Sequence, residues 1–450
     1  MKTTEHVVVI GAGVAGLMAA RRLSEAGLTV TVLEARDRVG GRIATRHRGD
    51  TPIELGAEFV HGRHPALWRI LKEAGLRTAE TPGGFHLVEQ GRWLDEDRPW
   101  DALDRLLTQA GEQDRSVADL IAAHRAAGDV DPRALDLLTT YVEGFHAAPL
   151  DRASLQAFLR EEAAADAIQG GRNFRILDGY DALPRHLADQ LAQQGASLLL
   201  DTEVTAITWR PGEVRITARQ GHSTRAKPLT LTARAAVVTV PLAVLAQPRH
   251  KLGAIRFDPA LPDAVQTAIH SLATGPVIKL LLQFRERFWA ESPTGPDFGF
   301  LHIRGAAIPT WWSLAPLPAP ILVGWAAGPA AERLASADQE ALLQAGLHGL
   351  ADAFGRTPAD LQALLEHHER THWQEDPWAR GAYSYVPVGQ GGALDVLSQP
   401  IADTLFLAGE AIHEHGHAGT VHGALASGER AAAKLLHGFA AETPRPAPLL

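Results

Sequence analysis

The sequence predicts an α/β fold in which a Rossmann-type domain is interleaved with an α+β domain. Three observations predict it. An apolar run at 7–10 leads into a glycine turn and then into an alanine-rich amphipathic segment, which is the order strand, turn and helix. The 450 residues exceed the usual limit of about 250 to 300 for one hydrophobic core, so two domains are expected. Motifs of one binding site also lie far apart in the chain, which indicates interleaving.

The glycine turn is typical of a dinucleotide site. Gly11 permits the tight turn, Gly13 lets the backbone approach a pyrophosphate, and Gly16 allows the helix to pack closely on the strand. The free N–H groups at the helix N-terminus point toward the phosphates. A second apolar run, 28–33, ends in Glu34, which can accept hydrogen bonds from ribose hydroxyls. The pattern predicts a dinucleotide but does not distinguish NAD from FAD.

The residues after Glu34 favour FAD. The sequence EARDRVGGR continues into a second glycine pair and Arg42, which can bring donors to the phosphate and ribityl groups. An NAD site does not require this extension.

With these motifs the chain resembles the flavin-containing amine oxidase family, which includes monoamine oxidases, polyamine oxidases, amino acid oxidases and flavin histone demethylases. The resemblance covers most of the chain and is closest to polyamine oxidases, bacterial ones among them, and to the demethylase branch. It rests on five ordered motifs: VVVIGAGVAGL with LEARDRVGGR, IELGAEFVHG, PVIKLLLQF, WQEDPWARGAYSYVPVG and LFLAGEAIHEHGHAGTVHGALASG.

The resemblance implies FAD as the cofactor. Because the chain has no cysteine, the cysteinyl flavin linkage of monoamine oxidases is excluded, and FAD is expected to be noncovalent unless a histidyl bond forms. In the family, the backbone at the position of Val204 contacts the adenine side. The cofactor-binding residues implied are Gly11, Gly13, Gly16, Glu34, Ala35, Arg36, Gly41, Arg42, Gly56, Ala57, Glu58, Val204, Trp373, Gly409, Glu410, Gly419, Thr420 and Val421.

The positions of the motifs predict the domain boundaries. Residues 1–80, 200–250 and 395–450 are expected to form the FAD-binding domain, and residues 81–199 and 251–394 the substrate-binding domain. DALDRLLTQAG, SVADLIAAHRAAG and ADQEALLQAGLHGLADAFG have helical periodicity, VIKLLLQF and APILVGWAAG are rich in strand formers, and PTWWSLAPLPAP is expected to connect strands.

Lys279 lies in an apolar strand pattern, where alternation places it on one face with Val277, Leu281 and Gln283. A lysine among apolar neighbours is costly unless a partner binds its ammonium group. One interpretation is a lysine on an edge strand whose amine reaches solvent. The resemblance implies another, in which Lys279 is catalytic because it holds a water against flavin N5 and assists reoxidation by O2.

Tyr383 and Thr420 are expected to bind the substrate. Aromatic side chains can wall a slot for an amine, and the resemblance places Tyr383, also a predicted catalytic residue, at one wall of an aromatic cage. The opposite wall is Thr420, where membrane monoamine oxidases carry tyrosine. The slot is therefore expected to be wider and to favour bulky secondary amines.

Histidines and acids complete the predicted site. His64, the third predicted catalytic residue, resembles a histidine near the substrate amine in some polyamine oxidases, although a solvated loop histidine fits equally well. The HEHGH segment has no recognisable metal-ligand spacing, so no metal is expected. Glu58 stands where related amino acid oxidases carry an arginine-containing variant, which points to a cationic substrate. Other acids considered for a distal ammonium are Glu143, Glu161, Glu162 and Glu414.

Composition limits the partners. The chain has 43 basic and 52 acidic residues, and its net charge of -9 argues against nonspecific nucleic-acid binding. No apolar run reaches the roughly 18 to 20 residues that span a bilayer, and the tail ETPRPAPLL is too polar to anchor. The first strand begins too early for a signal peptide to precede it. We expect a cytoplasmic protein without a membrane partner.

The motifs together predict oxidation of an amine, with a polyamine such as spermine or spermidine as the first choice. The resemblance implies hydride transfer from the carbon beside nitrogen to flavin N5, hydrolysis of the imine to an aldehyde and an amine, and reoxidation by O2 to give H2O2. The alternatives are another amine or L-amino acid oxidase, a related isomerase, desaturase or protoporphyrinogen-type oxidase, and a flavin- or NAD-binding protein without oxidase turnover.

Overall fold

A five-stranded parallel sheet brings together distant stretches of the chain. The structure, a computed structural model, describes residues 5–82, 84–94, 100–221, 226–293, 295, 297–413 and 415–442, without the side chains of 100 and 442. All neighbouring strands in the sheet are parallel. In spatial order they are β10 (Ser197–Leu199), β2 (Thr29–Leu33), β1 (His6–Ile10), β14 (Ala235–Val238) and β23 (Leu405–Leu407).

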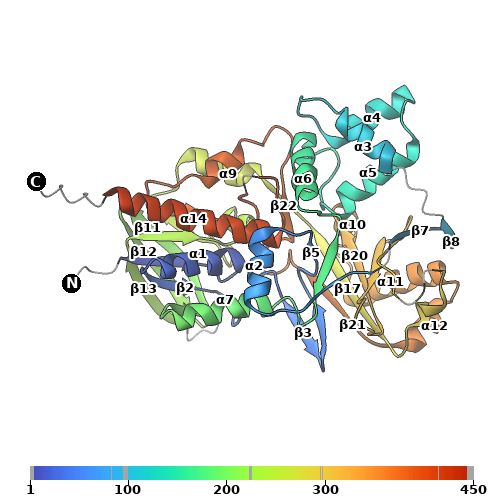
Figure 1. The fold of residues 1–450 in the computed structure, drawn as a ribbon, viewed down its shortest axis with the longest axis horizontal. Coiled ribbons are helices and arrows are strands. Elements are labelled where there is room, and N and C mark those ends of the chain that lie inside the picture. The colour runs from blue at the N-terminus through green and yellow to red at the C-terminus, as the bar shows by residue number, and fades with distance from the viewer. Residues whose placement is uncertain are drawn as a thin grey trace, which may run out of the picture.

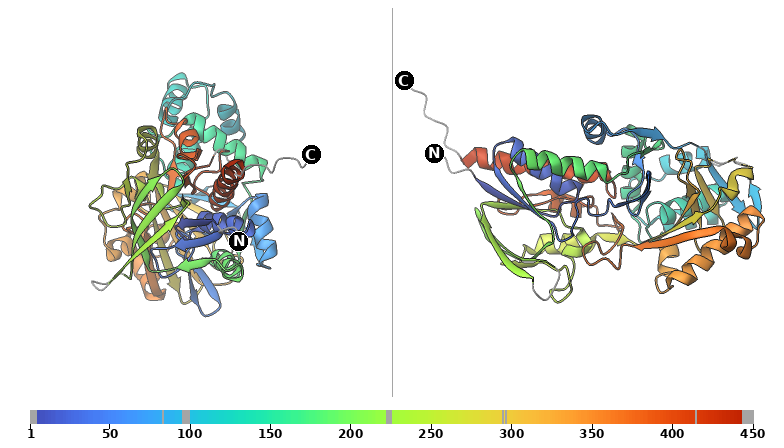
Figure 2. Two further views of the ribbon diagram at one scale, coloured as in Figure 1. Left: turned by 90° about the vertical axis from the view of Figure 1, so that its left-hand side faces the viewer. Right: turned by 90° about the horizontal axis from the view of Figure 1, so that it is seen from below.

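Both faces of this sheet are buried, which is why its strands are almost continuously apolar. Val7 and Val9 point to one face, and Val8 and Ile10 point to the other. The first face is covered by α1 (Val14–Glu25), α2 (Pro65–Glu73), α7 (Ala182–Gln193) and α14 (Val421–Glu442). Figure 2 shows these helices on one side of the sheet and a second, smaller sheet on the other.

The smaller sheet packs on the second face with three short helices. Its strands are β13 (Lys227–Ala233), β12 (Glu213–Gln220), β11 (Thr202–Arg210) and β15 (Arg256–Asp258). The helices are α8 (Leu242–Leu245), α9 (Asp263–Ser271) and α13 (Ala393–Ser398).

Two predicted domain boundaries need adjustment. Residues 173–199 were expected in the substrate-binding domain, but α7 packs on α1 and β10 extends the parallel sheet. Residues 256–271 likewise pack on the second face of the parallel sheet. Apolar side chains in these segments pack into the cores on the two faces of the parallel sheet. The positions of the motifs along the chain did not indicate this packing.

The other half of the elongated molecule is built on a seven-stranded mixed sheet (Figure 1). Its strands, in spatial order, are β21 (Leu365–His372), β17 (Val277–Phe284), β20 (Ile321–Ala327), β19 (Thr310–Ser313), β18 (Phe300–Ile303), β7 (Phe85–Glu89) and β8 (Arg92–Leu94). One face packs on α11 (Gln339–Phe354) and α12 (Pro358–Leu364), while α10 (Pro329–Arg333) and a 3-10 turn (Phe288–Glu291) lie near the strand ends.

A separate group of helices packs beside this sheet, and it includes the predicted helices of the first substrate-domain stretch. Its members are α3 (Trp100–Thr108), α4 (Val117–Ala127), α5 (Pro132–Gly144) and α6 (Leu155–Ala167). The predicted strands VIKLLLQF and APILVGWAAG and the predicted helix at α11 are confirmed. The expectation for PTWWSLAPLPAP was partly wrong, because 310–313 form β19 through pairing with β18 and β20, and only the following residues are a connection.

Three small ribbons lie outside these three sheets. They are β3 (Thr45–Arg48) with β4 (Thr51–Glu54), β5 (Val60–His61) with β9 (Asn173–Ile176) and β6 (Thr78–Glu80), and β16 (Ala273–Gly275) with β22 (Tyr383–Tyr385). The connection from β4 to β5, residues 55–59, faces the mixed sheet, where Ile53 and Phe59 pack with Leu281 and Trp312. This connection therefore lies at the contact between the two halves.

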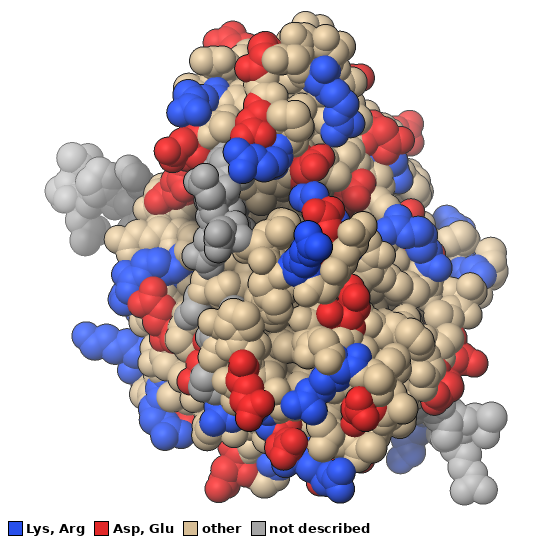
Figure 3. Space-filling model, turned by 90° about the vertical axis from the view of Figure 1, so that its right-hand side faces the viewer, with Lys and Arg blue, Asp and Glu red and all other residues tan. Residues whose placement is uncertain are grey.

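The surface carries mixed charge. Basic and acidic side chains are interspersed on the face shown in Figure 3. Within the described ranges, no helix is both long enough and apolar enough to cross a bilayer. The tail ETPRPAPLL lies almost entirely outside the described residues.

The close contact between α1 and α14 makes a testable prediction. A Cβ at Gly428 would lie 2.1 Å from the carbonyl oxygen of Ala15, whereas a Cβ at Gly438 in the same helix would meet nothing closer than 3.9 Å. Gly428→Ala should lower the free energy of unfolding by about 1 to 3 kcal/mol through overpacking. Gly438→Ala should raise it by up to about 1 kcal/mol through helix propensity. Thermal unfolding followed by circular dichroism should shift in opposite directions, and equal midpoints would contradict this packing.

Candidate functional site

The glycine turn lies at the carboxyl edge of the parallel sheet, where ligands of such sheets bind. Gly11 has a φ of +103°, a conformation that favours glycine. A Cβ at Gly16 would lie 1.9 Å from the carbonyl oxygen of Gly11, so the helix can approach the turn only with glycine there. At Gly13, the N-cap of α1, an added Cβ meets no described atom within 4 Å. The turn thus presents an open cradle at the N-terminus of α1, which fits a phosphate.

Glu34 stands beside this cradle. Its two oxygens accept hydrogen bonds from the backbone nitrogens of Ala12 (2.7 Å) and Arg36 (2.9 Å), so the buried carboxylate is held in place. Each oxygen retains capacity for a further donor such as a ribose hydroxyl. Ala35 is half-buried, and Arg36 bonds Asp376 at 2.6 Å.

The first and last motifs meet through one ion pair. Arg42 donates to Glu410 at 2.9 Å, and the other oxygen of Glu410 accepts from Ser384 and from the backbone nitrogen of Gly419 at 3.1 Å. Arg42, Gly409 and Glu410 line a cleft beyond the ends of β14 and β23. The donors and the open cradle suit a dinucleotide, and these residues remain predicted FAD contacts.

The remaining predicted cofactor residues take different places. Gly41 lies against Gly13, and Gly56 approaches the carbonyl oxygen of Arg42 so closely that a Cβ would lie 1.9 Å from it. The backbone nitrogen of Ala57 donates to Arg42 O, and the indole of Trp373 donates to Leu55 O. Val421 is the first residue of α14. Val204 is buried in β11 at a register shift of the ladder.

Lys279 lies in a central strand, since β17 pairs with β20 on one side and β21 on the other. It is 2% exposed, which excludes the interpretation as an edge lysine reaching solvent. Its side chain shares a face with Leu281 and points to the 55–59 connection. There Nζ donates to Glu54 O (2.8 Å), Gly56 O (3.1 Å) and Glu58 Oε2 (2.5 Å).

These contacts qualify the predicted role of Lys279. An ammonium group has three donors, and all three have protein acceptors. A water held by Lys279, as the resemblance implies, must therefore share or replace one of these acceptors.

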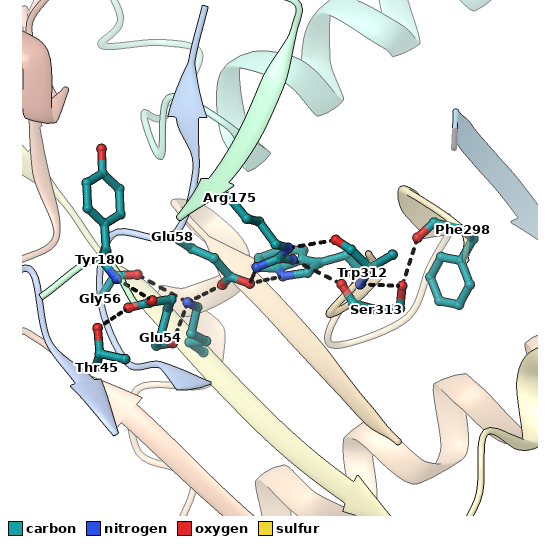
Figure 4. Close-up of polar contacts among 11 residues, drawn as sticks. Thr45, Glu54, Gly56, Glu58, Arg175, Tyr180, Phe298, Trp312 and Ser313 are labelled. Atoms are coloured by element: carbon teal, nitrogen blue, oxygen red, sulfur yellow. Dashed lines mark hydrogen bonds and ion pairs between the residues drawn. The ribbon is translucent and has the colours of Figure 1, made fainter. Parts of the chain in front are cut away.

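Glu58 is committed to protein partners, and its predicted contact with a cationic substrate is corrected. Oε1 accepts from Arg175 Nη1 (2.5 Å) and Trp312 Nε1 (2.8 Å), while Oε2 accepts from Lys279 (Figure 4). Burial by itself would raise the pKa of Glu58, but Lys279 and Arg175 outweigh it and hold this pKa below its ordinary range. Glu58 is thus an internal counterion.

Glu54 belongs to the same network but is bonded to neutral partners. Its carboxyl accepts from Thr45 Oγ1 (2.6 Å) and from the backbone nitrogen of Tyr180 (2.8 Å). Burial raises the pKa of Glu54 to about 7, so its charge changes near neutral pH.

The structure brings the ring of Tyr383 against Gly419, the residue before Thr420, and Gly419 bonds Glu410. The Tyr383 hydroxyl donates to Phe145 O at 2.5 Å. Thr420 Oγ1 accepts from Gly423 N (2.9 Å) and donates to His417 O (2.7 Å). Thr420 therefore also caps α14, a role that threonine fills well and tyrosine does not. The amine slot between Tyr383 and Thr420 stays a prediction.

His64 lies in a group of histidines rather than beside Tyr383. It precedes α2, stacks on His422 at 4.8 Å and meets His417 edge-on. Burial lowers the pKa of His64, lowers that of His417 to about 4 and lowers that of His422 to about 2, so these rings are neutral at physiological pH. It is His61 that meets Phe145 edge-on at 5.5 Å, next to the Tyr383 contact.

Two of the other acids considered, Glu161 and Glu162, are paired within the protein. Glu161 pairs with His146 at 3.1 Å, and Glu162 lies 3.5 Å from the same ring and accepts from Tyr141. Glu161 and Glu162, two of the acids considered for a distal ammonium, thus have a basic partner within the protein. Glu143 is half-buried on α5, and Glu414 lies outside the described residues. In the described part of the chain, no group of three histidines or acids is arranged to hold a metal ion.

Three site residues were missed by sequence reasoning: Arg175, Trp312 and Phe145. A signal for Arg175 was present, because it is a single cation in the otherwise apolar run FRI, just as Lys279 is in its strand. Phe145 is 47% exposed at the end of α5, and only its contacts with His61 and Tyr383 connect it to the site.

Comparisons with known proteins agree over nearly the whole chain. The family described as "Flavin containing amine oxidoreductase" matches residues 14–436. Human Lysine-specific histone demethylase 2 is 28% identical over 465 residues, 96% of this chain and 53% of that protein, so this chain spans about half its length. Probable polyamine oxidase 4 of Arabidopsis thaliana is 30% identical, covering 94% of this chain and 85% of that protein.

A solved structure confirms the fold class. Wild-type putrescine oxidase bound to putrescine superposes with a TM-score of 0.79 at 21% identity, and the match covers 97% of this chain and 99% of that one. The parallel sheet and the mixed sheet described above are thus a known arrangement.

The cluster around His146 generates a pH prediction. Burial would lower the pKa of His146, but Glu161 and Glu162 raise it to about 9. Because the folded pKa lies above the ordinary value of about 6.5, the stabilisation is complete below that pH and is lost as pH rises through about 9. His146→Gln should therefore destabilise the protein by up to about 3 kcal/mol at pH 6 and much less at pH 9.5.

Thermal unfolding of the wild-type protein and of His146→Gln between pH 6 and pH 9.5 measures this difference in stability. His348→Gln, which changes an exposed histidine of α11, is the control, and its difference in stability from wild type should not change with pH. If wild type were more stable than His146→Gln by the same amount at every pH, the result would contradict a charged His146.

Proposed function

The chain belongs to the flavin-containing amine oxidoreductase family, and from that premise we propose that it oxidises a polyamine such as spermine or spermidine with noncovalently bound FAD. When bound, FAD would accept a hydride from the carbon beside the amine nitrogen and pass two electrons to O2, which leaves as H2O2. The imine product hydrolyses in water to an aldehyde and a shorter amine.

The residues of this chain supply binding and exclusion of water. The cradle at Gly13 and the carboxylate of Glu34 would hold the pyrophosphate and a ribose, and Arg42 with Glu410 would close the site from the C-terminal side. Lys279 places a buried ammonium at the 55–59 connection. Noncovalent binding is supported by the absence of cysteine from the sequence, and acid precipitation should release the flavin into the supernatant.

The observation that carries the polyamine proposal is a threonine at position 420, directly after Gly419, which lies against the Tyr383 ring. A threonine occupies less volume than the tyrosine of monoamine oxidases, so a chain with a secondary nitrogen has room beside Tyr383. The likeness to plant polyamine oxidases over most of both chains supports it.

A second candidate is an amine with an apolar body, and a specific observation favours it. Glu58, Glu161 and Glu162, all considered as anchors for a substrate cation, are paired with Arg175, Lys279 and His146 instead. Phe145 is exposed, and its backbone carbonyl accepts a hydrogen bond from the Tyr383 hydroxyl, so an apolar residue reaches the surface close to Tyr383. An L-amino acid is less suited, because Arg175 is committed to Glu58 and does not offer its charge to a carboxylate.

Peroxide release tests these candidates. The purified protein should show a flavin spectrum and release H2O2 with spermine or spermidine faster than with putrescine, benzylamine or L-amino acids. Turnover confined to benzylamine would favour the second candidate, and turnover confined to amino acids would overturn both. A bound flavin without peroxide from any of them would indicate a flavin protein that is not an oxidase.

The width of the slot can be tested by filling it. Thr420→Tyr should lower kcat/KM for spermine by roughly tenfold or more, because the ring would narrow the space beside Tyr383. Thr420→Val is the matched control, since it loses the same helix cap, worth about 1 kcal/mol, without adding a ring. Benzylamine, a flat primary amine, should be affected much less. Equal losses for both amines, or for both variants, would contradict a slot at Thr420.

A further inference from the structure

The ammonium of Lys279 has one charged acceptor among the described residues, and it is Glu58. The other two acceptors are the neutral carbonyl oxygens of Glu54 and Gly56. A charged acceptor forms a stronger hydrogen bond than a neutral one, roughly twofold in energy. The position of Nζ therefore depends mainly on where the Glu58 carboxylate is held.

Glu58 is itself held from the opposite side. Arg175 and Trp312 both donate to Oε1, at 2.5 and 2.8 Å. Arg175 cannot easily turn away, because it also donates to Ala315 O (2.9 Å) and Ser313 O (3.0 Å) and lies over the ring of Phe59. Figure 4 shows Glu58 next to Arg175 and Trp312.

The three charged side chains are deeply buried and do not balance each other. Glu58, Arg175 and Lys279 are 6%, 4% and 2% exposed. Two cations share one carboxylate, so the group carries one net positive charge. In such surroundings electrostatic interactions are far stronger than in water, and removal of the carboxylate would leave two buried cations without a counterion.

We propose that Glu58, fixed by Arg175 and Trp312, is a positioning residue that sets the place and the charge balance of the Lys279 ammonium in the step in which O2 reoxidises the reduced cofactor. In that step O2 takes two electrons and one proton from reduced FAD and a second proton from solvent, and leaves as H2O2. The inference rests on the proposed function, because it assigns Glu58 to the oxidative half of that reaction.

The inference has a distinctive consequence. If Glu58 acts through Lys279, its removal has an effect only while Lys279 is present, so the two substitutions are not additive. A carboxylate with a purely structural role would slow both half-reactions through lost cofactor binding, and would do so in either background.

The test is a double-mutant cycle of Glu58→Gln and Lys279→Met in the FAD-loaded protein. The flavin is reduced with dithionite, so no amine is needed, and mixed with O2 in a stopped-flow instrument. Each single variant should reoxidise at least roughly tenfold more slowly than wild type, and the double variant should match Lys279→Met. All measurements are made at one pH, because the pKa of the neighbouring Glu54 is raised to about 7.

A second readout does not depend on turnover. The midpoint potential of the bound flavin should rise in Glu58→Gln, where the net charge of the group goes from one to two, and fall in Lys279→Met, where it goes to zero. Shifts in the same direction, or none, would overturn the charge assignment.

A milder variant tests the inference if Glu58→Gln does not fold. Trp312→Phe removes one hydrogen bond to Glu58 and leaves all three charges in place. It should slow reoxidation several-fold, and not at all in the Lys279→Met background. Glu203→Gln is the matched control, since Glu203 is a buried glutamate paired with Arg219 and makes no contact with Lys279. It should reoxidise at the wild-type rate.

The outcomes separate the two proposals. Wild-type reoxidation in both Glu58→Gln and Trp312→Phe, or slowing that persists without Lys279, would overturn the inference even if amines reduce the flavin. Failure of every amine to reduce the flavin, with the double-mutant pattern intact, would overturn the substrate proposal alone. A purified protein without flavin would overturn both.

Discussion

The shared carboxylate of Glu58 is the interaction on which the contact between the two halves depends. It joins the 55–59 connection to β17 through Lys279, to β9 through Arg175 and to β19 through Trp312. Buried charges of this kind persist only with compensating partners. The connection is consequently held against the mixed sheet, and the carbonyl oxygens of Glu54 and Gly56 are held with it.

A second constraint closes the site from the other side. The parallel sheet places the ends of β1, β14 and β23 at one edge, and Arg42 with Glu410 then links the first motif to the last. Because Glu410 also accepts from Gly419 and Ser384, the segment before α14 and the strand of Tyr383 are fixed relative to the glycine turn. The positions of Tyr383 and Thr420 are therefore set in part by contacts with Glu410 of their neighbours Ser384 and Gly419.

The acids show that residue type alone does not determine whether a carboxylate binds a substrate or a cation of the protein. Glu58, Glu161 and Glu162 were each attractive anchors for a cationic substrate, yet each is balanced by an internal cation. Arg175 and Lys279 lie more than a hundred positions from Glu58, whereas His146 is close in sequence to Glu161 and Glu162; in both cases charge compensation is a property of spatial neighbours. A buried acid therefore indicates a substrate cation only after the cations of the protein have been placed.

The sequence by itself determined the local structures and the class of protein. The strand, glycine turn and helix at 7–25, the strand of Lys279 and the helices of the 100–167 segment follow from apolar periodicity and from glycine conformations, which act over a few residues. Only the tertiary structure decided that residues 173–199 join the half built on the parallel sheet and that Lys279 bonds Glu58. Packing and charge compensation act between residues more than a hundred positions apart, and no local pattern records which distant side chain will be the partner.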